Sequence, residues 1–171
     1  MKKITFCILA LMSPLSAENL FDNSTMDTTG GWKGDKKFVK EGDDEKAPKK
    51  PAKEEAADKE KPNRVLQLTA KLRDQVSFSQ EVPTKGLTDL TIKFRYRTKN
   101  YIGRGLMLRG KRASGNYTYT DRPLVADGEW HEMSWDFNQV EGSNKIDFFF
   151  IALEGTGDIY FDDITVEAPK K

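Results

Sequence analysis

The sequence predicts an all-β protein, an antiparallel sandwich or barrel, from three observations. From Arg64 onward, apolar and polar residues alternate with a period of two over several short runs. Glycine, asparagine and aspartate separate these runs, as in Ser114–Asn116 and Asp127–Gly128. No run places its apolar residues at the spacing of a helix face. Short alternating strands between tight turns are typical of half-buried antiparallel sheets.

The expected strands follow one another closely along the chain. They cover residues 66–72, 76–82, 90–96, 106–109, 117–120, 130–137, 146–153 and 159–166. The stretch from Ile146 to Leu153 is almost continuously apolar, which predicts a central strand covered on both faces. Large rings at alternating positions are expected in the interior. These rings are Trp32, Trp130, Trp135, Phe137, Phe148 and Phe150.

The N-terminus has the three parts of a secretory signal peptide. Met1–Lys3 is positively charged, Ile4–Met12 is apolar and Ser13–Ala17 ends in small residues. We expect cleavage after Ala17, and therefore a secreted or periplasmic protein. Residues 1–17 contain the one cysteine, Cys7, so the mature chain relies on its core and has no disulfides to stabilise it.

A charged segment at residues 40–62 interrupts the chain. It holds seven lysines, eight acidic residues and three prolines, and it contains no aromatic or branched aliphatic residue. This composition cannot bury enough apolar surface to offset the entropy of ordering, so we expect a disordered insertion. Residues 18–39 are too few to fold alone. We therefore expect one domain over residues 18–167, followed by a short tail at 168–171.

The overall charge excludes some partners. The chain of 171 residues has 28 Lys and Arg against 27 Asp and Glu, a net charge of +1, which argues against a protein held to nucleic acid mainly by charge. The apolar run Ile4–Met12 is too short to span a bilayer.

Several short stretches, in their order along the chain, resemble a known family. They are Asn19–Phe21 with Asn23–Asp27 and Gly31–Trp32, then Asp127–His131, and finally Gly157–Val166. Together they resemble carbohydrate-binding modules of the galactose-binding-like jelly-roll type, with the charged insertion at 40–62 as a departure from that pattern. The resemblance implies a jelly-roll sandwich. It implies less about the ligand, because one fold serves sugar binding, protein binding and structural roles.

The same resemblance implies a structural calcium ion. Such jelly rolls often tie the first strand to the last through calcium, and the matching positions here are Asp27, Asp162 and Asp163. Calcium needs several oxygen ligands, and neighbouring residues of a strand point to opposite faces. We therefore expect only one of Asp162 and Asp163 to serve. The alternative is that both carboxylates bond to turn amides or face solvent.

The charges are divided between two blocks. Residues 93–122 contain nine Lys and Arg against Asp121, and residues 123–167 contain eleven acidic residues against Lys145. One interpretation is that the two blocks pair across strands on a solvated sheet face. The other is an anionic glycan held by ring stacking and charge-assisted hydrogen bonds. The candidate ligand-binding residues for that site are Tyr101, Tyr117, Tyr119, Arg95, Arg97, Arg109 and Lys111.

Catalysis is not expected. The chain has one histidine, His131, for which we expect a structural role, and no serine or mature cysteine lies in a nucleophile motif. The preferred hypothesis is a secreted carbohydrate-binding module that binds without turnover. The alternative is a structural or protein-interaction jelly roll whose partner is another envelope protein.

Overall fold

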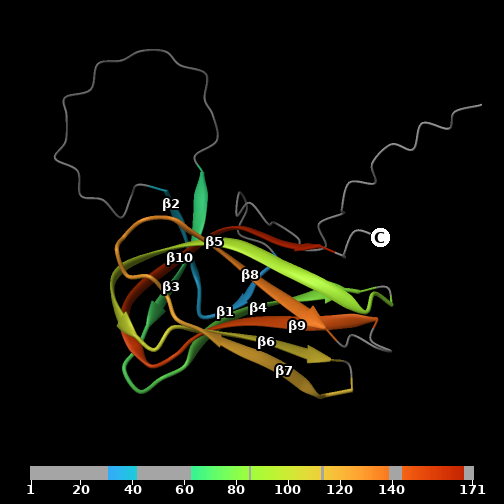
Figure 1. Cartoon of the computed structure of the whole chain (residues 1–171). Helices are drawn as coiled ribbons and strands as arrows, with labels where there is room; N and C mark the ends of the chain where they lie inside the picture. The colour runs from blue at the N-terminus through green and yellow to red at the C-terminus, as the bar shows by residue number, and fades with distance from the viewer. Residues whose placement is uncertain (1–30, 42–62, 85, 113, 139–143, 168–171) are drawn as a thin grey trace, which may run out of the picture.

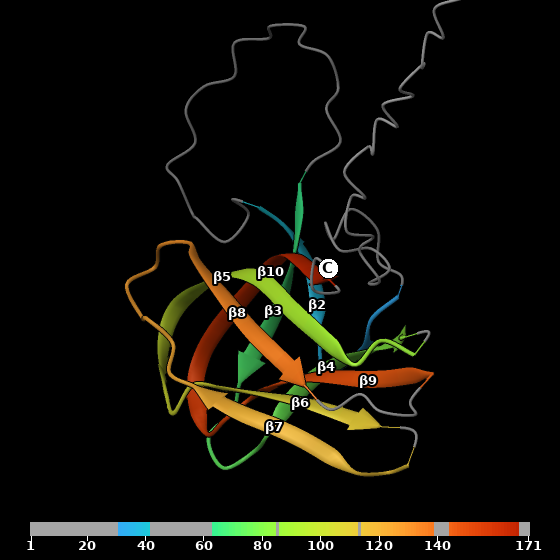
Figure 2. The same cartoon turned by 45° about the vertical axis from the view of Figure 1, so that its right-hand side comes forward.

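Ten β-strands form two five-stranded sheets in the computed structural model, which describes residues 31–41, 63–84, 86–112, 114–138 and 144–167. The strands are β1 (Lys33–Gly34), β2 (Lys37–Lys40), β3 (Arg64–Ala70), β4 (Val76–Pro83), β5 (Asp89–Gly103), β6 (Leu106–Arg112), β7 (Tyr117–Arg122), β8 (His131–Asn138), β9 (Lys145–Ala152) and β10 (Gly155–Glu167). The first sheet has the order β1-β4-β9-β6-β7, and the second has the order β2-β3-β10-β5-β8. The two sheets lie as separate layers (Figures 1 and 2).

All pairs of neighbouring strands in both sheets are antiparallel. The predicted all-β antiparallel sandwich is therefore confirmed. The central position of the apolar strand is also confirmed, because β9 lies between β4 and β6. β9 is covered by the core on one side and carries half-buried side chains on the other, which explains its nearly continuous apolar sequence.

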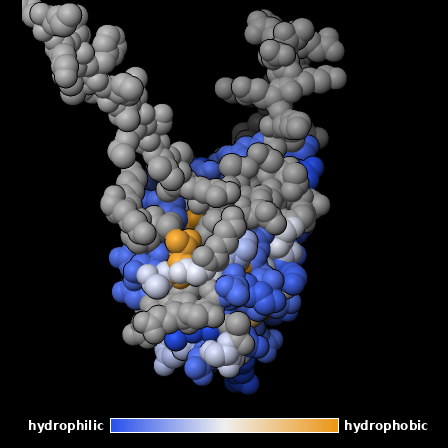
Figure 3. Space-filling model, turned by 90° about the vertical axis from the view of Figure 1, so that its right-hand side faces the viewer, coloured by the Kyte–Doolittle hydropathy of each residue, from blue (hydrophilic) through white to orange (hydrophobic). Residues whose placement is uncertain are grey.

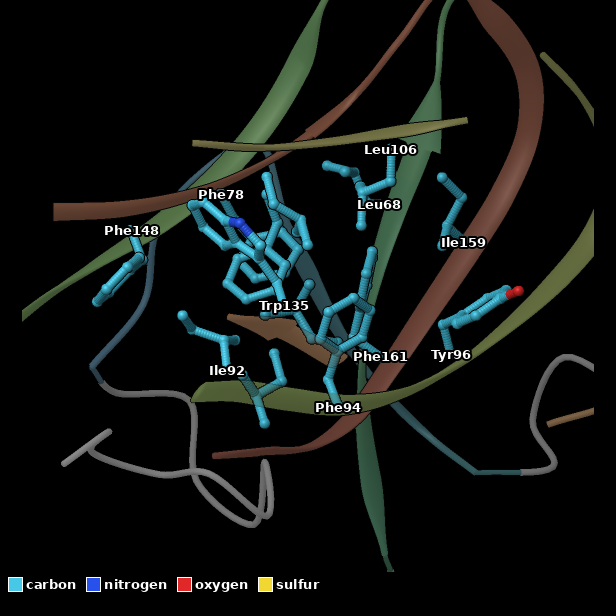
Figure 4. Packing of buried hydrophobic residues seen from close by; sticks show 14 of the residues in the cluster. Leu68, Phe78, Ile92, Phe94, Tyr96, Leu106, Trp135, Phe148, Ile159 and Phe161 are labelled. Carbon is cyan, nitrogen blue, oxygen red and sulfur yellow. The ribbon is translucent and has the colours of Figure 1, made fainter. Parts of the chain in front are cut away.

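Aromatic rings from both sheets fill the space between the layers. Phe78 stacks on Phe150 of the neighbouring strand, with ring centroids 4.8 Å apart. Phe161 of the second sheet meets Phe78 edge-on at 4.9 Å, so the two sheets interlock through these rings (Figure 4). Each such buried ring contributes about 1.5–3 kcal/mol to folding. Trp32, Trp135, Phe137, Phe148 and Phe150 are all buried, as predicted.

Two expectations about the strands are wrong. Leu72 does not continue the alternation of β3, because it lies in the turn before β4 and its side chain is 68% exposed. Trp130 is half-buried and precedes β8 on the outer face of the second sheet, where arginine side chains cover its ring. In both cases the residue lies just beyond a strand, where the alternation of faces no longer applies.

The strands on either side of the charged segment are partners in the second sheet. β2 pairs with β3, and Lys40 lies opposite Arg64. The N–H of Glu41 donates to the carbonyl of Asn63 at 3.0 Å, so the chain leaves and re-enters the sheet at one place. The expected signal peptide, most of the expected insertion and the C-terminal tail lie outside the described residues.

Candidate functional site

β6 presents cations on the outer face of the first sheet. Its side chains alternate, so Leu106, Leu108 and Gly110 point into the core while Arg109 and Lys111 point outward. On one side, β7 places Tyr119 opposite Arg109 and Tyr117 opposite Lys111. On the other side, β9 places Phe149 opposite Arg109. We call the set of Arg109, Lys111, Tyr117, Tyr119 and Phe149 the Arg109 face.

The guanidinium of Arg109 lies over two aromatic rings. Its central carbon is 4.8 Å from the ring centroid of Tyr117 and 4.7 Å from that of Phe149. These cation–π contacts hold the long side chain in one place. The Nε atom is buried and has no hydrogen-bond partner in the part of the chain that the structure describes. Arg109 is therefore positioned by aromatic rings, and no carboxylate among these residues neutralises it.

The two tyrosines of this face are open to solvent. Tyr117 is 49% exposed and Tyr119 is 66% exposed, which makes them two of the few exposed large hydrophobic side chains in the described ranges. The Lys111 ammonium lies 5.7 Å from the Tyr117 ring centroid. The structure thus brings four of the predicted ligand-binding residues together: Arg109, Lys111, Tyr117 and Tyr119. Rings beside cations suit the apolar faces and hydroxyl groups of sugars.

Phe149 was missed by the sequence analysis, although its strand was predicted correctly. Within an almost continuously apolar run, neither face is marked as the outer one. The acidic residue Asp147, two positions earlier, could have shown it. A charged side chain is expected on the outer face of β9, and residues two positions apart in a strand share a face, so Phe149 faces outward with Asp147.

A glycine sets the position of the Arg109 face. Gly110 lies between Arg109 and Lys111 and faces the core, where a Cβ atom would stand 2.4 Å from Cε2 of Phe137. The absent side chain makes room for this ring, which comes from the second sheet. The two cations are therefore held at the surface by a close approach of the sheets beneath them.

Arg95 and Arg97 lie on the opposite side of the molecule from the Arg109 face. They belong to β5 in the second sheet, and the guanidinium of Arg97 lies 5.3 Å from the ring centroid of Trp130 and 5.2 Å from that of Tyr160. Arg95 lies 5.2 Å from the same Trp130 ring. The predicted basic residues therefore do not form one surface but divide between two sheets.

Cross-strand pairing accounts for part of the charge pattern. Lys93 on β5 bonds to Glu167 on β10 at 2.9 Å, and Arg95 bonds to Asp162 at the same distance. These pairs join the basic and acidic blocks, as one of the two interpretations predicts. Arg109 has no such pair among the described residues, so the pairing interpretation holds on the second sheet and does not extend to this arginine.

A β-bulge brings Asp162 and Asp163 to the same cation. The register with β5 shifts between Asp162 and Thr165, and Asp163 has a φ of 49°. Arg95 therefore reaches both carboxylates, each at 2.9 Å. The expectation that the two carboxylates point to opposite faces is wrong, because it assumed a regular strand.

The surroundings of Asp162 do not fit the predicted calcium site. The carboxylate is 2% exposed and already accepts hydrogen bonds from Arg95 and from the N–H of Asp163. Burial raises the pKa of Asp162, with the charge of Asp163 adding to the rise and Arg95 opposing it. The described ranges contain no cluster of three or more potential metal ligands. Asp27 lies outside them, so the calcium site stays a prediction.

The structure places Tyr101 in the core, where it cannot stack on a ligand. Its ring is buried, and its hydroxyl group accepts the N–H of Gly105 at 2.9 Å and lies 3.1 Å from the carbonyl of the same residue. Burial raises the pKa of this phenol. Tyr101 thus fixes the turn between β5 and β6, and its prediction as a surface ligand was wrong.

His131 anchors a loop. Its Nε2 atom lies 2.8 Å from Oδ1 of Asp127, and its ring lies 5.5 Å from that of Tyr96. The hydrogen bond with His131 lowers the pKa of Asp127. The hydroxyl of Tyr96 accepts the N–H of Val125, which ties the same loop to β5. These contacts agree with the structural role expected for His131.

The side of the molecule shown in Figure 3 is mainly hydrophilic over the described residues, with one small hydrophobic area. None of the described segments forms a long apolar helix of the kind that crosses a bilayer.

Comparison with solved structures places this architecture among known folds. The module TmCBM61, solved in complex with β-1,4-galactotriose, matches at a TM-score of 0.58 and 17% identity over 90% of this chain and 100% of its own. The CBM22-1 xylan-binding domain of Paenibacillus barcinonensis Xyn10C matches at 0.53 and 12% identity, over 92% of this chain and 95% of its own. This chain has the jelly-roll fold of carbohydrate-binding modules.

The same jelly roll also occurs in larger proteins. The enzymatically active domain of bacteriophage CBA120 tailspike protein 4 matches at a TM-score of 0.60 and 8% identity, over 88% of this chain and 21% of its own. No protein-family model and no curated protein matches the sequence. The predicted resemblance to the carbohydrate-binding jelly rolls is confirmed at the level of the fold.

Proposed function

We propose that the protein is a secreted or periplasmic carbohydrate-binding module that holds a glycan on the Arg109 face without cleaving it. The observation that carries this proposal is the position of the Arg109 guanidinium over the rings of Tyr117 and Phe149. Tyr117 is itself exposed, and so is the neighbouring Tyr119. The shared fold with TmCBM61, a module solved with a bound galactotriose, supports it.

Binding would use the two kinds of side chain in different ways. Tyr119 and the free part of Tyr117 stack on the apolar faces of sugar rings, and the nitrogen atoms of Arg109 donate hydrogen bonds to sugar oxygens. Because the stacked rings already restrict Arg109, less conformational entropy is lost when a ligand binds. Arg109 and Lys111 together favour glycans that carry carboxylate or sulfate groups.

The test is a glycan array of the purified protein, with neutral, sulfated and uronic-acid glycans at two salt concentrations. Arg109→Ala is expected to weaken binding about 10- to 100-fold, the value of a hydrogen bond to a charged group. Tyr119→Ala is expected to weaken it about 2- to 10-fold through lost stacking. Higher salt should weaken the binding of anionic glycans more than that of neutral ones.

Matched controls distinguish the site from a general effect of charge or apolar surface. Arg104→Ala removes an exposed arginine from the turn between β5 and β6, and Leu72→Ala removes an exposed apolar side chain from the turn before β4. Both should bind glycans as the wild type does. The proposal fails if no glycan binds, or if Arg109→Ala and Arg104→Ala have equal effects. In that case a protein partner in the envelope becomes the better hypothesis.

A further inference from the structure

The strand β7 forms an open edge of the first sheet. It pairs with β6 along its whole length of six residues and with no other strand in the described ranges. All its residues are exposed or half-buried, and it lies at the margin of the molecule in Figures 1 and 2. Tyrosine and threonine, which favour strands, make up its first four residues, and the strand contains no lysine or proline.

The other three edges of the described sheets carry features that hinder pairing. β1 has only two residues. β2 begins and ends with lysine, and β8 carries the acidic residues Glu132 and Asp136. Short edge strands and edge strands with charged side chains prevent natural sheets from associating edge to edge. The only charged residues of β7 are its last two, Asp121 and Arg122, and their charges are opposite.

The hydrogen bonds between β6 and β7 indicate which backbone groups point to the open edge. The N–H of Arg112 donates to the carbonyl of Asn116 at 2.9 Å, so these opposite residues form a hydrogen-bonded pair. Such pairs alternate with non-bonded pairs along an antiparallel ladder, and the backbone groups of Thr118 and Thr120 therefore point to β6. The residues between them point their N–H and carbonyl groups to the open edge. These edge-facing residues are Tyr117, Tyr119 and Asp121.

We infer that β7 pairs antiparallel with the β7 of a second copy, about a two-fold axis. When Tyr119 lies opposite Tyr119 of the second copy, Tyr117 lies opposite Asp121 of that copy. All three edge-facing residues then form hydrogen-bonded pairs. A shift of the register by two residues loses such a pair. It would bring either Pro123, which has no N–H, or Gly115 in the turn opposite an edge-facing residue.

The charges and the number of open edges favour a second copy as the partner. Two β7 strands do not repel each other, because the charges of Asp121 and Arg122 cancel, whereas two copies of β2 or of β8 would bring like charges together. A symmetric contact through the open edge uses this edge in both copies, so the assembly closes as a dimer. The pairing needs only backbone groups and does not depend on the function proposed for the Arg109 face.

Sedimentation velocity of the full chain over a range of concentrations tests the inference, with no glycan present. The wild type is expected to show an equilibrium between monomer and dimer. Asp121→Pro removes an edge-facing N–H and no hydrogen bond to β6, so it should raise the dissociation constant of the dimer at least about tenfold. Asp121→Asn is the matched control, because it removes the same charge and keeps the N–H. It should dimerise as the wild type does, and circular dichroism checks that both variants fold.

Disulfide trapping tests the register without the proline variant. In a chain with Cys7→Ser, Tyr119→Cys places two thiols opposite each other across the two-fold axis. Hydrogen-bonded pairs have Cα atoms about 5.5 Å apart, which is within the reach of a disulfide. Tyr117→Cys is the control, because its two copies would lie four residues apart along the strands, about 13 Å at ~3.3 Å per residue. A mild oxidant should link Tyr119→Cys into dimers and leave Tyr117→Cys largely monomeric.

Each result bears on the inference. A dimer that weakens in Asp121→Pro and persists in Asp121→Asn supports it, and so does selective linking of Tyr119→Cys. A wild type that stays monomeric at every concentration overturns it, and a strand of another protein then becomes the better candidate for this edge. A dimer that the proline leaves unchanged, or equal linking at both cysteine positions, would mean that β7 is not the interface. Growth beyond the dimer would contradict the closed arrangement.

Discussion

The ion pair between Arg95 and Asp162 allows a quantitative prediction about stability. Replacing Arg95 by methionine keeps much of the packing over Trp130 but leaves the buried carboxylate of Asp162 without its counter-charge. Removing one partner of a buried pair costs about 3–5 kcal/mol. Because the Arg95 side chain is 37% exposed, water screens the pair, and we expect a loss of about 2–3 kcal/mol at pH 7. The melting temperature should fall by roughly 5–10 °C.

The loss should depend on pH in a defined direction. Burial, with the nearby charge of Asp163, raises the pKa of Asp162 above its ordinary value of 3.8, so the folded state holds this proton more tightly than the unfolded chain. Asp162 therefore stabilises the folded state fully when the pH is below its ordinary pKa of 3.8. This stabilisation is lost as the pH rises through the higher pKa of Asp162 in the folded protein. Without Arg95 the pKa rises further, so the variant should lose more stability than the wild type between pH 4 and pH 7.

Urea unfolding followed by circular dichroism at pH 4 and pH 7 measures this difference. Lys93→Met is the control, because its ion pair with Glu167 is exposed and should contribute no more than about 1 kcal/mol. A second variant, Arg95→Met with Asp162→Asn, removes both charges and should recover part of the loss at pH 7. Equal losses of stability for Arg95→Met at both pH values, or no recovery in the double variant, would contradict this account of the ion pair.

Three further predictions concern the core and the metal. Gly110→Ala should cost about 1–3 kcal/mol, because the new Cβ would overlap the ring of Phe137, and it should also weaken glycan binding; unchanged stability in thermal melts would contradict the close approach of the sheets. Tyr101→Phe should cost about 1–2 kcal/mol at neutral pH, because it leaves the buried N–H of Gly105 without an acceptor. Since the pKa of Tyr101 is raised, the wild type loses stability as the pH rises above about 10. The difference in free energy of unfolding between the wild type and Tyr101→Phe, measured by urea unfolding, should therefore become smaller there. A larger difference above about pH 10 would contradict the raised pKa. Asp162→Asn should not alter the response of the melting temperature to a calcium chelator; a response present in the wild type and absent in the variant would make Asp162 a ligand after all.

Local patterns in the sequence were sufficient to predict most strands. Alternation between polar and apolar residues depends only on neighbours along the chain, so β3, β4, β5 and β8 could be recognised without knowing their partners. The buried rings of Phe78 and Phe150 follow from the same alternation. Errors occurred where a strand ends or bulges, as at Leu72 and Asp163, because local steric and hydrogen-bonding conditions there change the direction of the side chain.

The candidate site could be predicted only in part. Arg109 and Tyr119 were both among the candidate residues and lie opposite each other, because a single turn joins their strands. Tyr101 looked equally suitable in the sequence, yet it is buried, since its position beside a turn does not reveal which way the ring points. Phe149 could not be assigned to a face within an apolar run.

Local patterns along the chain are enough to predict the all-β class, the positions of the main strands and the division of charge into a basic block at residues 93–122 and an acidic block at 123–167. Where these charges meet depends on the fold. It places Arg95 and Arg97 on one sheet and Arg109 on the other, and it joins Arg95 to Asp162 while leaving Arg109 between two rings. Strand pairing is set by hydrogen bonds and packing between segments far apart in the chain. Adjacent stretches of one basic block therefore came to lie on opposite faces of the protein.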